Sequence, residues 1–593
     1  MFFASLLAMI IGGVVMVALL IGSLVGLATK MATSATSPAE ASAIKDKSVL
    51  VLDIGKSFHE QGEDNSFSML GNSEGAAAGV YEIGRALQAA AGDDKVKGIL
   101  IRLSASPNSW ATLQQVREDL LQFKKSGKFI YAYGESITQG ALFVATAADS
   151  IFLNPAGDIE LKGLSSSTPF FKNTLAKLEL EPEIFYAGKF KSATEPFRAD
   201  KMSEPNRLQV AALQAGIWNE FLVAVAGHAH KDTAAIHQLA VNGNIQFPGD
   251  ALAQQLIEGI RYWDEVENMI KKKVAIAEDK DLILPDVSDY YNSPAVTNPA
   301  KDSRVAILFA EGQIMDGSSG SDYQIASENM TKAIRELRND DKIKAVVLRV
   351  NSPGGSARAS EVILRELSLL HQKKPLVVSM GDVAASGGYY ISCQADSIFA
   401  MPTTITGSIG VFTMMFNGEK LLNNKLGITF DQVKNAPYAD FPTPTRHMTP
   451  AEMALMQRGV DTVYGLFKSR VAAGRKMPEA NVDSIAQGRV WTGKDALSIG
   501  LVDAMGNLDR AVKSAAALAK LNEYQIKTYP EKVDRIKSLV KMVTKSASVS
   551  SAIEQSIKKE LGSSAYHGLL QLRQLQQMNG RCMMLLPFDI VTR

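Results

Sequence analysis

The sequence has few of the side chains that build metal centres and covalent cross-links. Among its 593 residues are two cysteines, Cys393 and Cys582, and seven histidines. Two cysteines exclude a disulfide framework and a cysteine-ligated zinc site. Each is expected to be a buried apolar residue, with one long-range disulfide as the alternative. The closest histidine pair, His228 and His230, has no carboxylate at ligand spacing. We therefore expect no metal ion and no cofactor.

Net charge is also nearly absent. The chain has 63 lysines and arginines against 62 aspartates and glutamates, a formal net charge of +1. No strong field draws the protein to polyanions, so we expect no nucleic-acid partner. Hydrophobic residues make up 46% of the chain, which is ordinary for globular proteins. At this length, two or more packed domains are the default expectation.

Charge is missing altogether from residues 2–29. This apolar run exceeds the about 20 residues that cross a bilayer as a helix. It is too long for a cleavable signal peptide and has no basic start. We predict an uncleaved transmembrane anchor over residues 1–29 and a flexible, polar tether over 30–47. The positive-inside rule gives no support for an outside body, because Lys30, Lys45 and Lys47 all follow the span.

The rest of the chain repeats itself. The stretch DDKVKGILIRL at 93–103 returns as DDKIKAVVLRV at 340–350, and AADSIFLNP at 147–155 returns as QADSIFAMP at 394–402. Both pairs lie 247 residues apart, and two matches at one offset are hard to obtain by chance. Such self-similarity indicates an internal duplication.

Each half alternates short branched-aliphatic runs with amphipathic stretches. This alternation predicts βα units and a parallel sheet with helices around it. We therefore expect an α/β fold of two tandem βα-repeat domains, residues 48–295 and 296–533. The linker composition of 288–303 marks their boundary. Residues 534–593 are predicted to form a helical tail.

Paired glycines follow the strand predicted at 344–350. Gly354 and Gly355 lie at its carboxyl end, where sites in α/β sheets gather. Their backbone N–H groups could form an oxyanion hole for a substrate carbonyl, and a plain Pro-Gly turn is an equally good interpretation. The equivalent loop of the first half, 104–108, has no glycine. The second half alone carries this feature.

Two serines and one lysine are candidates for nucleophilic chemistry. Ser408 lies between glycines, where a turn is the commoner role, and Ser386 precedes a predicted helix, where N-capping is the commoner role. A serine nucleophile needs a base, but the histidines of the second half, His371 and His447, lie in polar stretches. A desolvated lysine can act as that base. Lys191 is one candidate, although most lysines are solvated surface residues.

Four motifs occur in order along the chain: GKFKSATEPFRADKMS (188–203), NSPGGSA (351–357), DVAASGGYYIS (382–392) and TGSIGVF (406–412). Together they resemble the signal peptide peptidase A family, also called protease IV, in its long two-repeat form. The resemblance implies a Ser–Lys dyad protease on a fold similar to that of Clp proteases and crotonases. It implies Ser408 as nucleophile, Lys191 rather than Lys189 as general base, and Gly354 and Gly355 as the oxyanion hole.

The duplication agrees with a site divided between the halves. The position 247 residues after Lys191 is Tyr438, and the position 247 residues before Ser408 is Leu161. Each half lacks the group that the other supplies, so we expect one active site built across both. Residues 431–438, DQVKNAPY, depart from the family, in which more hydroxyl groups are expected there to support the lysine.

The resemblance further implies a homotetramer with a single pass through the bacterial inner (cytoplasmic) membrane and its body on the periplasmic side. The implied activity is endopeptidase cleavage of signal-peptide remnants and other hydrophobic peptides through an acyl-enzyme. A crotonase-like acyl-thioester enzyme is one alternative, disfavoured because such enzymes are soluble and need no Ser–Lys pair. An inactive membrane scaffold is the other, disfavoured because the motif residues are intact.

Overall fold

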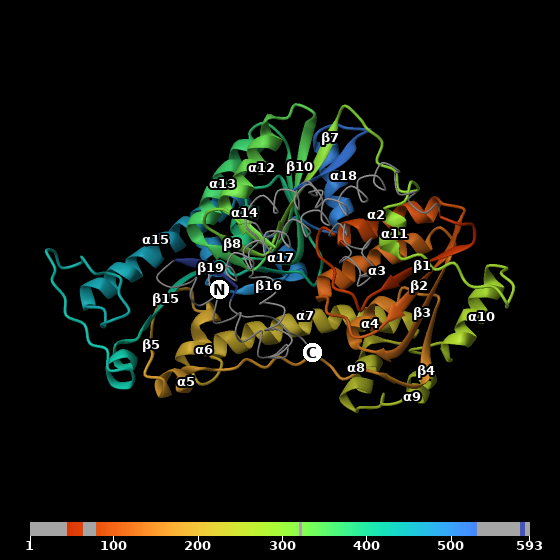
Figure 1. The fold of residues 1–593 in the computed structure, drawn as a ribbon, viewed down its shortest axis with the longest axis horizontal. Coiled ribbons are helices and arrows are strands. Elements are labelled where there is room, and N and C mark those ends of the chain that lie inside the picture. The colour runs from red at the N-terminus through yellow and green to blue at the C-terminus, as the bar shows by residue number, and fades with distance from the viewer. Residues whose placement is uncertain (1–43, 63–78, 320–322, 531–581, 587–593) are drawn as a thin grey trace, which may run out of the picture.

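The computed structural model describes residues 44–62, 79–319, 323–530 and 582–586. Figure 1 shows the first half of the chain, in red and orange, beside the second half, in green to blue. The predicted anchor over 1–29 and most of the tether over 30–47 lie outside the described residues.

The first half forms a parallel five-stranded sheet. Its elements are β1 (Ser48–Asp53), α2 (Val80–Gly92), β2 (Val96–Leu103), α3 (Trp110–Lys124), β3 (Phe129–Ile137), α4 (Gln139–Ala145), β4 (Ser150–Ile159) and β6 (Gly259–Ile260). The strand order is β1-β2-β3-β4-β6. Strands such as β2 are nearly continuous apolar runs because both faces of a parallel sheet are covered.

The second half repeats this pattern in an eight-stranded sheet. Its elements are β7 (Arg304–Glu311), α12 (Ser327–Asn339), β10 (Ile343–Ser352), α13 (Ala357–His371), β12 (Leu376–Ala385), α14 (Gly387–Ser392), β13 (Ser397–Ala400), β14 (Ile405–Gly407), β16 (Val490–Thr492), α17 (Gly493–Ser498), β17 (Ala504–Met505), α18 (Leu508–Leu518) and β18 (Gln525–Tyr529). Helices α3 and α13 begin at Trp110 and Ala357, and strands β3 and β12 begin at Phe129 and Leu376. Each pair is 247 residues apart, which is the offset of the sequence repeat, and the expectation of an α/β fold is confirmed.

A third sheet joins the halves. Its strands are β5 (Glu181–Ala187), β8 (Gln313–Met315), β9 (Gln324–Ala326), β11 (Gly354–Ser356), β15 (Val411–Asn417) and β19 (Met583–Leu585). They follow the order β5-β15-β19-β11-β8-β9. Strand β5 of the first half pairs antiparallel with β15 of the second, with Ala187 opposite Val411. This pairing carries the end of β5 into the second half.

Strand β19 corrects part of the prediction of a helical tail over 534–593. Of that segment the structure describes 582–586, and three of these residues form a strand. They are extended because their backbone pairs with β11 and β15. The rest of the predicted tail lies outside the described residues.

Helix α7 (Glu204–His228) runs along one side of the molecule, beneath both halves (Figure 1). Within the described ranges it is the one helix long and apolar enough to cross a membrane by length and composition. Phe221 packs in the core of the first half, and Leu213 packs against Ile405 and Val490 of the second. These contacts with both halves account for its apolar character.

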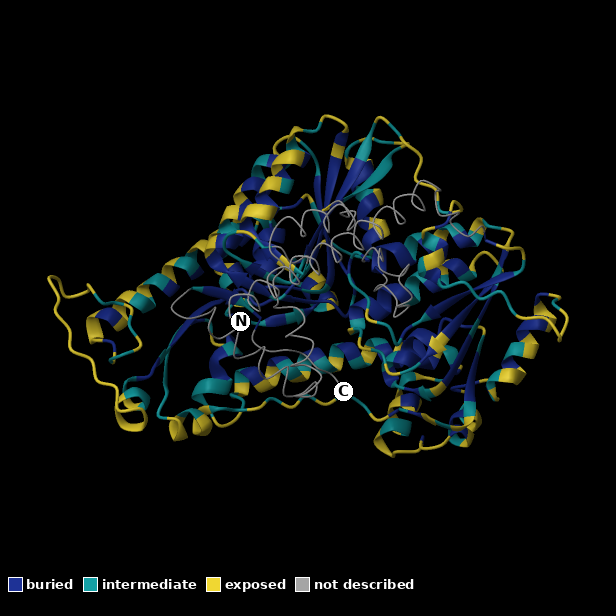
Figure 2. Cartoon of the chain, viewed as in Figure 1, coloured by how far each residue is buried: buried dark blue, intermediate teal, exposed yellow. Residues whose placement is uncertain are grey.

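The remaining elements lie around these sheets. They are α5 (Lys172–Lys177), η2 (Ser192–Thr194), α6 (Glu195–Arg198), α8 (Thr233–Val241), α9 (Pro248–Ala253), α10 (Trp263–Lys273), α11 (Val287–Tyr291), η3 (Leu421–Lys425), α15 (Pro450–Arg475) and α16 (Glu479–Ile485). Figure 2 shows the central sheets buried and a projecting arm, residues 418–449, largely exposed.

Candidate active site

Lys191 reaches the second half because of the pairing between β5 and β15. The chain turns at Gly188, directly after β5, and the Phe190 N–H donates to the Gln487 carbonyl at 2.8 Å. Gly488 packs closely on the lysine, since a Cβ atom on Gly488 would lie 2.7 Å from the Lys191 Cβ. The lysine backbone is therefore held between the end of β5 and the loop that leads into β16.

The Lys191 side chain is buried and meets two serine hydroxyl groups. Its Nζ lies 3.0 Å from Ser408 Oγ and 2.9 Å from Ser386 Oγ. Lys191 is 1% exposed, and this burial lowers its pKa well below the ordinary value of 10.5 because the charged amine loses its hydration. The neutral amine favoured by burial is the form that can accept a proton from a serine.

Ser386 and Ser408 leave the ends of neighbouring strands. Strands β12 and β14 are parallel, with Ala385 opposite Gly407, and each serine follows directly. Their backbones have φ values of 56° and 49°, a left-handed conformation that costs a non-glycine residue about 1–3 kcal/mol and gathers at functional sites. The expected capping role of Ser386 is not seen. Its hydroxyl makes no capping bond to α14 and contacts Lys191 instead.

A buried amide on α7 supports the lysine loop. Gln209 Nε2 donates to the Phe190 carbonyl at 3.1 Å and to Ser192 Oγ at 3.0 Å. Gln209 Oε1 accepts from the Val490 N–H at 3.2 Å. One side chain of the first half therefore fixes the residues on both sides of Lys191 against strand β16 of the second half.

The nearest acidic side chain of the lysine motif is directed elsewhere. Glu195 is buried and accepts hydrogen bonds from the Ser203 N–H at 3.2 Å and from Asn206 Nδ2 at 2.8 Å. Within the described part of the chain, burial is the only cause that shifts the pKa of Lys191. A nearby carboxylate would raise that pKa, so the position of Glu195 favours the neutral amine.

Gly354 and Gly355 are the first two residues of β11, and no side chain would fit at either position. Gly354 has a φ of 99°, and a Cβ atom there would lie 2.0 Å from the Met584 carbonyl oxygen. A Cβ atom on Gly355 would lie 1.9 Å from the Ile314 carbonyl oxygen. The Gly354 N–H donates to Ser352 Oγ at 3.2 Å. Gly387, the residue after Ser386, packs on this loop, because its Cβ would lie 3.1 Å from the Gly354 Cα.

The loop 104–108, Leu161 and Tyr438 are the positions in the other half that correspond to the glycine loop, Ser408 and Lys191. The 104–108 loop is held by Asn108, whose Nδ2 donates to the Lys56 carbonyl at 2.8 Å. Leu161 is buried in the core of the first half, and Tyr438 is half exposed on the arm. The described structure brings Lys191, Ser408 and Ser386 together at one place, with residues from both halves.

The other candidates for the base and for its supporting groups lie outside this cluster. His371 pairs with Asp396 at 3.0 Å, and His447 pairs with Glu181 at 3.1 Å. Residues 431–438 are exposed on the arm, and the hydroxyl group that meets the lysine comes from Ser386 instead. Local sequence did not reveal Ser386 and Gln209 as partners of the lysine loop, because both contacts join distant parts of the chain.

Cysteines and cation-binding groups do not contribute to the cluster. Both Cys393 and Cys582 are free thiols. Across residues 44–62, 79–319, 323–530 and 582–586, no three His, Cys, Asp or Glu side chains group as metal ligands.

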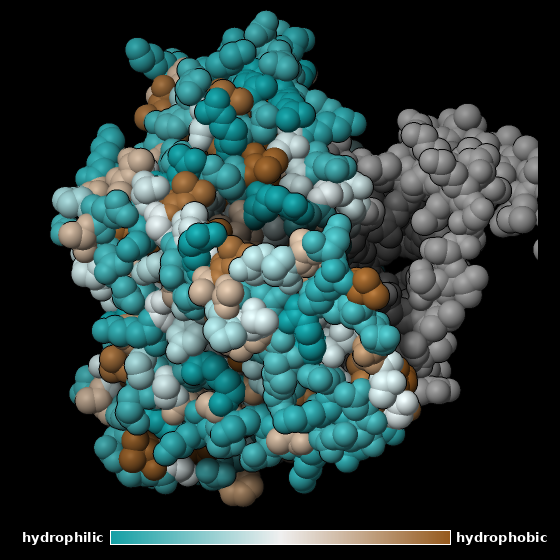
Figure 3. All heavy atoms as spheres, turned by 90° about the vertical axis from the view of Figure 1, so that its left-hand side faces the viewer, coloured by the Kyte–Doolittle hydropathy of each residue, from teal (hydrophilic) through white to brown (hydrophobic). Residues whose placement is uncertain are grey.

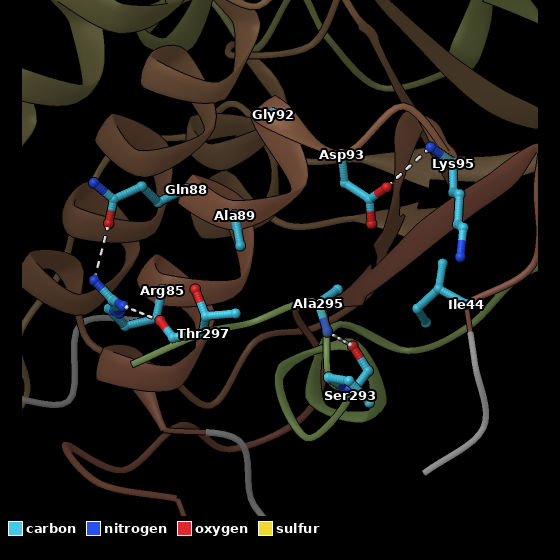
Figure 4. Close-up of a pocket in the computed structure, with 11 residues that line it drawn as sticks. Ile44, Arg85, Gln88, Ala89, Gly92, Asp93, Lys95, Ser293, Ala295 and Thr297 are labelled. Atoms are coloured by element: carbon cyan, nitrogen blue, oxygen red, sulfur yellow. Dashed lines mark hydrogen bonds between the residues drawn. The ribbon is translucent and has the colours of Figure 1, made fainter. Parts of the chain in front are cut away.

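The surface offers two further features, both away from the lysine. A cavity of ≈ 690 Å³ lies beside α2 in the first half, where Arg85 and Asp93 line it with Ser293 (Figure 4). Figure 3 shows the face that carries the arm as mainly hydrophilic, with hydrophobic residues scattered over it. Neither feature includes Lys191, Ser386 or Ser408.

Comparison with known proteins agrees with the duplication. The sequence pattern of peptidase family S49 matches twice, at residues 122–277 and 368–522. The first match contains Lys191, and the second contains Ser386 and Ser408.

Curated relatives carry protease names. Protease 4 of Salmonella typhi is 34% identical, over 76% of this chain and 74% of its own length. Serine protease SPPA, chloroplastic, of Arabidopsis thaliana is 34% identical over 73% of this chain and 64% of its own length. Protease 4 of Haemophilus influenzae is 33% identical over 74% and 72%. A solved ClpP1 mutant from Listeria monocytogenes is 13% identical, with a TM-score of 0.24, over 35% of this chain and 94% of that chain. The chain therefore belongs to peptidase family S49, as a serine protease of the long two-repeat form.

Proposed function

We propose that this protein is a membrane-anchored endopeptidase that uses Ser408 as nucleophile and Lys191 as general base. The observation that carries the proposal is the buried Lys191 amine, 3.0 Å from Ser408 Oγ. A general base must lie within about 2.6–3.2 Å of the atom whose proton it takes. Burial lowers the pKa of Lys191, and this supplies the neutral form that such a base requires.

The proposed reaction follows acyl-enzyme chemistry. Lys191 Nζ takes the proton of Ser408 as Oγ attacks the peptide carbonyl, and the carbonyl oxygen becomes an oxyanion. The N–H groups of Gly354 and Gly355 are the proposed donors to that oxyanion, each worth about 3–4 kcal/mol in such sites. The Lys191 ammonium then gives its proton to the leaving amine as the C–N bond breaks. Water, deprotonated by the same lysine, releases the acyl group.

Ser386 is proposed to orient the lysine. Its Oγ lies 2.9 Å from Nζ, so the amine is held by one hydroxyl while it faces the other. A neutral amine has one lone pair and two N–H groups, which suits its contacts with the two hydroxyl groups and with the Ser408 carbonyl at 3.3 Å. Ser386 thereby takes the place of the hydroxyl groups that were expected at residues 431–438.

The remaining features of the proposal rest on the sequence and its resemblance to the family. They are a Clp- and crotonase-like course for each repeat, an anchor over residues 1–29, a homotetramer, and a body on the periplasmic side of the bacterial inner membrane. The proposed substrates are signal-peptide remnants and other hydrophobic peptides. Membership of a peptidase family favours this activity over an acyl-thioester enzyme or an inactive scaffold.

Active-site labelling tests the proposal. A fluorophosphonate probe should label the purified wild-type protein, and peptide mapping should place the adduct on Ser408. The Ser408→Ala variant should lose both labelling and peptide hydrolysis while its melting temperature stays near that of the wild type. Labelling on Ser386, with the Ser408→Ala variant still active, would overturn the assignment.

A further inference from the structure

A short loop of the second half contacts the proposed nucleophile through its backbone. Residues 487–489, hereafter the positioning loop, lie between α16 and β16. The Ser408 N–H donates to the Arg489 carbonyl at 2.7 Å, and the Gly488 N–H donates to the Ile409 carbonyl at 2.8 Å. The loop therefore fixes Ser408 and the residue that follows it.

The same loop contacts the lysine. The Gln487 carbonyl accepts from the Phe190 N–H at 2.8 Å. A Cβ atom on Gly488 would lie 2.7 Å from the Lys191 backbone nitrogen, so the glycine allows a close approach that another residue would prevent. Three consecutive residues thus determine where the base lies relative to the nucleophile.

The Arg489 side chain adds a second connection between the positioning loop and the lysine. Its guanidinium carbon lies 4.0 Å from the centre of the Trp491 ring and 5.3 Å from the centre of the Phe190 ring. Guanidinium groups stack on aromatic faces, which attract cations. Trp491 is itself fixed, because its Nε1 donates to the Ile485 carbonyl at 3.1 Å. The arginine therefore joins Phe190, the residue before Lys191, to strand β16.

Arg489 is half-buried, and its interactions differ from those of a surface ion pair. Its Nε is buried and makes no hydrogen bond with any residue that the structure describes. Burial lowers the pKa of the guanidinium, although Asp495 acts in the opposite direction. Removing a cation from water without such bonds is costly, so the two aromatic faces provide compensating contacts.

We propose that Arg489 is a positioning residue: its stack with Phe190 and Trp491 holds the Lys191 amine within proton-transfer distance of Ser408 Oγ. The inference rests on the proposed function and adds a residue to that same site. The guanidinium contacts two rings rather than the reacting atoms, so it acts through the backbone that leads into the lysine. Without it the lysine gains freedom, and a displacement of about 1 Å costs up to about 100-fold in rate at such sites.

Loss of the stack should also change the surroundings of the lysine amine. The Ser386 and Ser408 hydroxyl groups face Nζ at 2.9 and 3.0 Å, and Glu195 of the lysine motif is bonded elsewhere. Within the described chain, burial is the only cause that shifts the pKa of Lys191. A loosened backbone admits water to the amine, and this pKa then rises toward its ordinary value. The pH at which activity rises should therefore move in the alkaline direction.

Three variants test the proposal. Arg489→Met removes the charge and the planar group at similar length, so kcat should fall about tenfold or more while KM stays within about twofold of the wild type. The rise of kcat/KM should move by about half a pH unit or more in the alkaline direction. Phe190→Leu keeps the charge of Arg489 and should shift the profile in the same direction. Arg489→Lys keeps a cation over the rings, so its kcat should lie between those of the wild type and Arg489→Met.

Lys273 provides the matched control. Its Nζ also lies over two rings, 5.4 Å from the centre of Phe129 and 5.6 Å from the centre of Tyr131. Helix α10, which carries Lys273, lies at the far end of the molecule from β5 and β15 (Figure 1). Lys273→Met removes a cation from two aromatic faces away from the lysine, so kcat and the pH profile should match those of the wild type.

Wild-type kcat and an unshifted profile in Arg489→Met or in Phe190→Leu would overturn the proposal. Activity that falls only in proportion to the folded fraction, measured by circular dichroism at the assay temperature, would also overturn it, because a merely structural residue would leave the profile unchanged. The Ser408→Ala variant separates this inference from the proposed function. An active Ser408→Ala protein would refute the dyad, whereas an inactive one beside a normal Arg489→Met protein would refute the positioning role alone.

Discussion

At the scale of single residues, the candidate site combines one buried lysine amine with two serines whose backbones are strained. Lys191 has no compensating carboxylate within its described surroundings, and burial alone lowers its pKa. Ser386 and Ser408 keep left-handed backbones because strand pairing holds the residues before each of them. Strained backbone persists only where the surrounding structure fixes it, and it is concentrated at functional sites.

Removal of the Ser386 hydroxyl should slow the reaction without stopping it. The Ser386→Ala variant loses one hydrogen bond to Lys191, worth about 0.5–1.5 kcal/mol, so kcat should fall about two- to tenfold. KM should stay close to that of the wild type, because the hydroxyl contacts the lysine rather than the substrate. Steady-state kinetics measure both constants.

A serine of α14, the short helix that follows Ser386, provides the control. Ser392 is buried, and its Oγ donates to the Gly388 carbonyl at 2.7 Å. Ser392→Ala should leave kcat unchanged. If Ser386→Ala were inactive while Ser408→Ala kept activity, Ser386 would be the nucleophile and the roles of the two serines would have to be exchanged.

Motifs in the sequence predicted the candidate site residues, whereas the topology of the chain determined how these residues meet. The glycines around Ser408 and the two lysines of the 188–203 motif are visible in the sequence. The contact between Lys191 and Ser386 spans 195 residues, and no local periodicity reports a contact at that distance. The capping role expected for Ser386 was wrong for this reason.

At the scale of elements, helix α7 connects the lysine loop to the second half. Gln209 uses both ends of its amide, donating to the Phe190 carbonyl and accepting from the Val490 N–H. The helix begins with Ser203 as its N-cap, which accepts from the Asn206 N–H at 3.3 Å. A side chain near the start of α7 therefore holds the lysine in register with β16.

Replacement of Gln209 should weaken this connection. Gln209→Leu leaves buried polar groups unpaired, which costs about 1–3 kcal/mol of stability, and it frees the lysine loop, so kcat should fall at least tenfold. Gln214→Leu is the control on the same helix, because Gln214 bonds Ser166 outside the lysine loop. Urea unfolding and kcat measure the two effects. Equal kcat values for the two variants would show that α7 does not position the lysine.

The strands and helices of the two repeats could be predicted from the sequence, whereas the third sheet could not. Buried aliphatic runs such as Val96–Leu103 and Ile343–Ser352 show their strand character locally. Strand β19 became extended only because β11 and β15 offer it two open edges. Its apolar residues suit a helix or a strand equally, so tertiary pairing decided the outcome.

At the scale of the whole molecule, a buried polar interface joins the halves. Arg349 of β10 is 1% exposed and donates to Glu60 Oε2 at 2.6 Å and to Gln115 Oε1 at 3.0 Å, both in the first half. Burial raises the pKa of Glu60 to about 7, although Arg349 acts in the opposite direction. Asp382 of β12 likewise accepts from the Thr112 hydroxyl at 2.7 Å. These contacts hold the halves in the arrangement that brings Lys191 to Ser408.

Loss of Arg349 should destabilise the protein in a pH-dependent way. The Arg349→Met variant leaves Glu60 buried without its partner, which costs about 3–5 kcal/mol when the carboxylate is charged. Without the arginine, the folded-state pKa of Glu60 rises further above its unfolded value, so the folded state binds the proton more tightly. Stability of the variant therefore increases as pH falls. The loss should be larger at about pH 8 than at about pH 6, as measured by urea unfolding.

An exposed arginine of the same half provides the comparison. Arg335 pairs with Glu366 and its side chain is 57% exposed, so Arg335→Met should change stability by about 0.5 kcal/mol or less at either pH. Equal effects of Arg335→Met and Arg349→Met would show that the polar interface does not hold the halves together.

The pH dependence of kcat/KM tests the central claim, that a neutral Lys191 removes the proton of Ser408. Burial lowers the pKa of the amine, and only the deprotonated amine is active. Activity should therefore rise with pH through a single ionisation and then level off. Lys191→Arg should lose activity by about 10³-fold or more at every pH, because a guanidinium does not deprotonate in this range. A wild-type profile that is flat from about pH 6 to about pH 10, or an arginine variant with normal activity, would show that another group takes the proton.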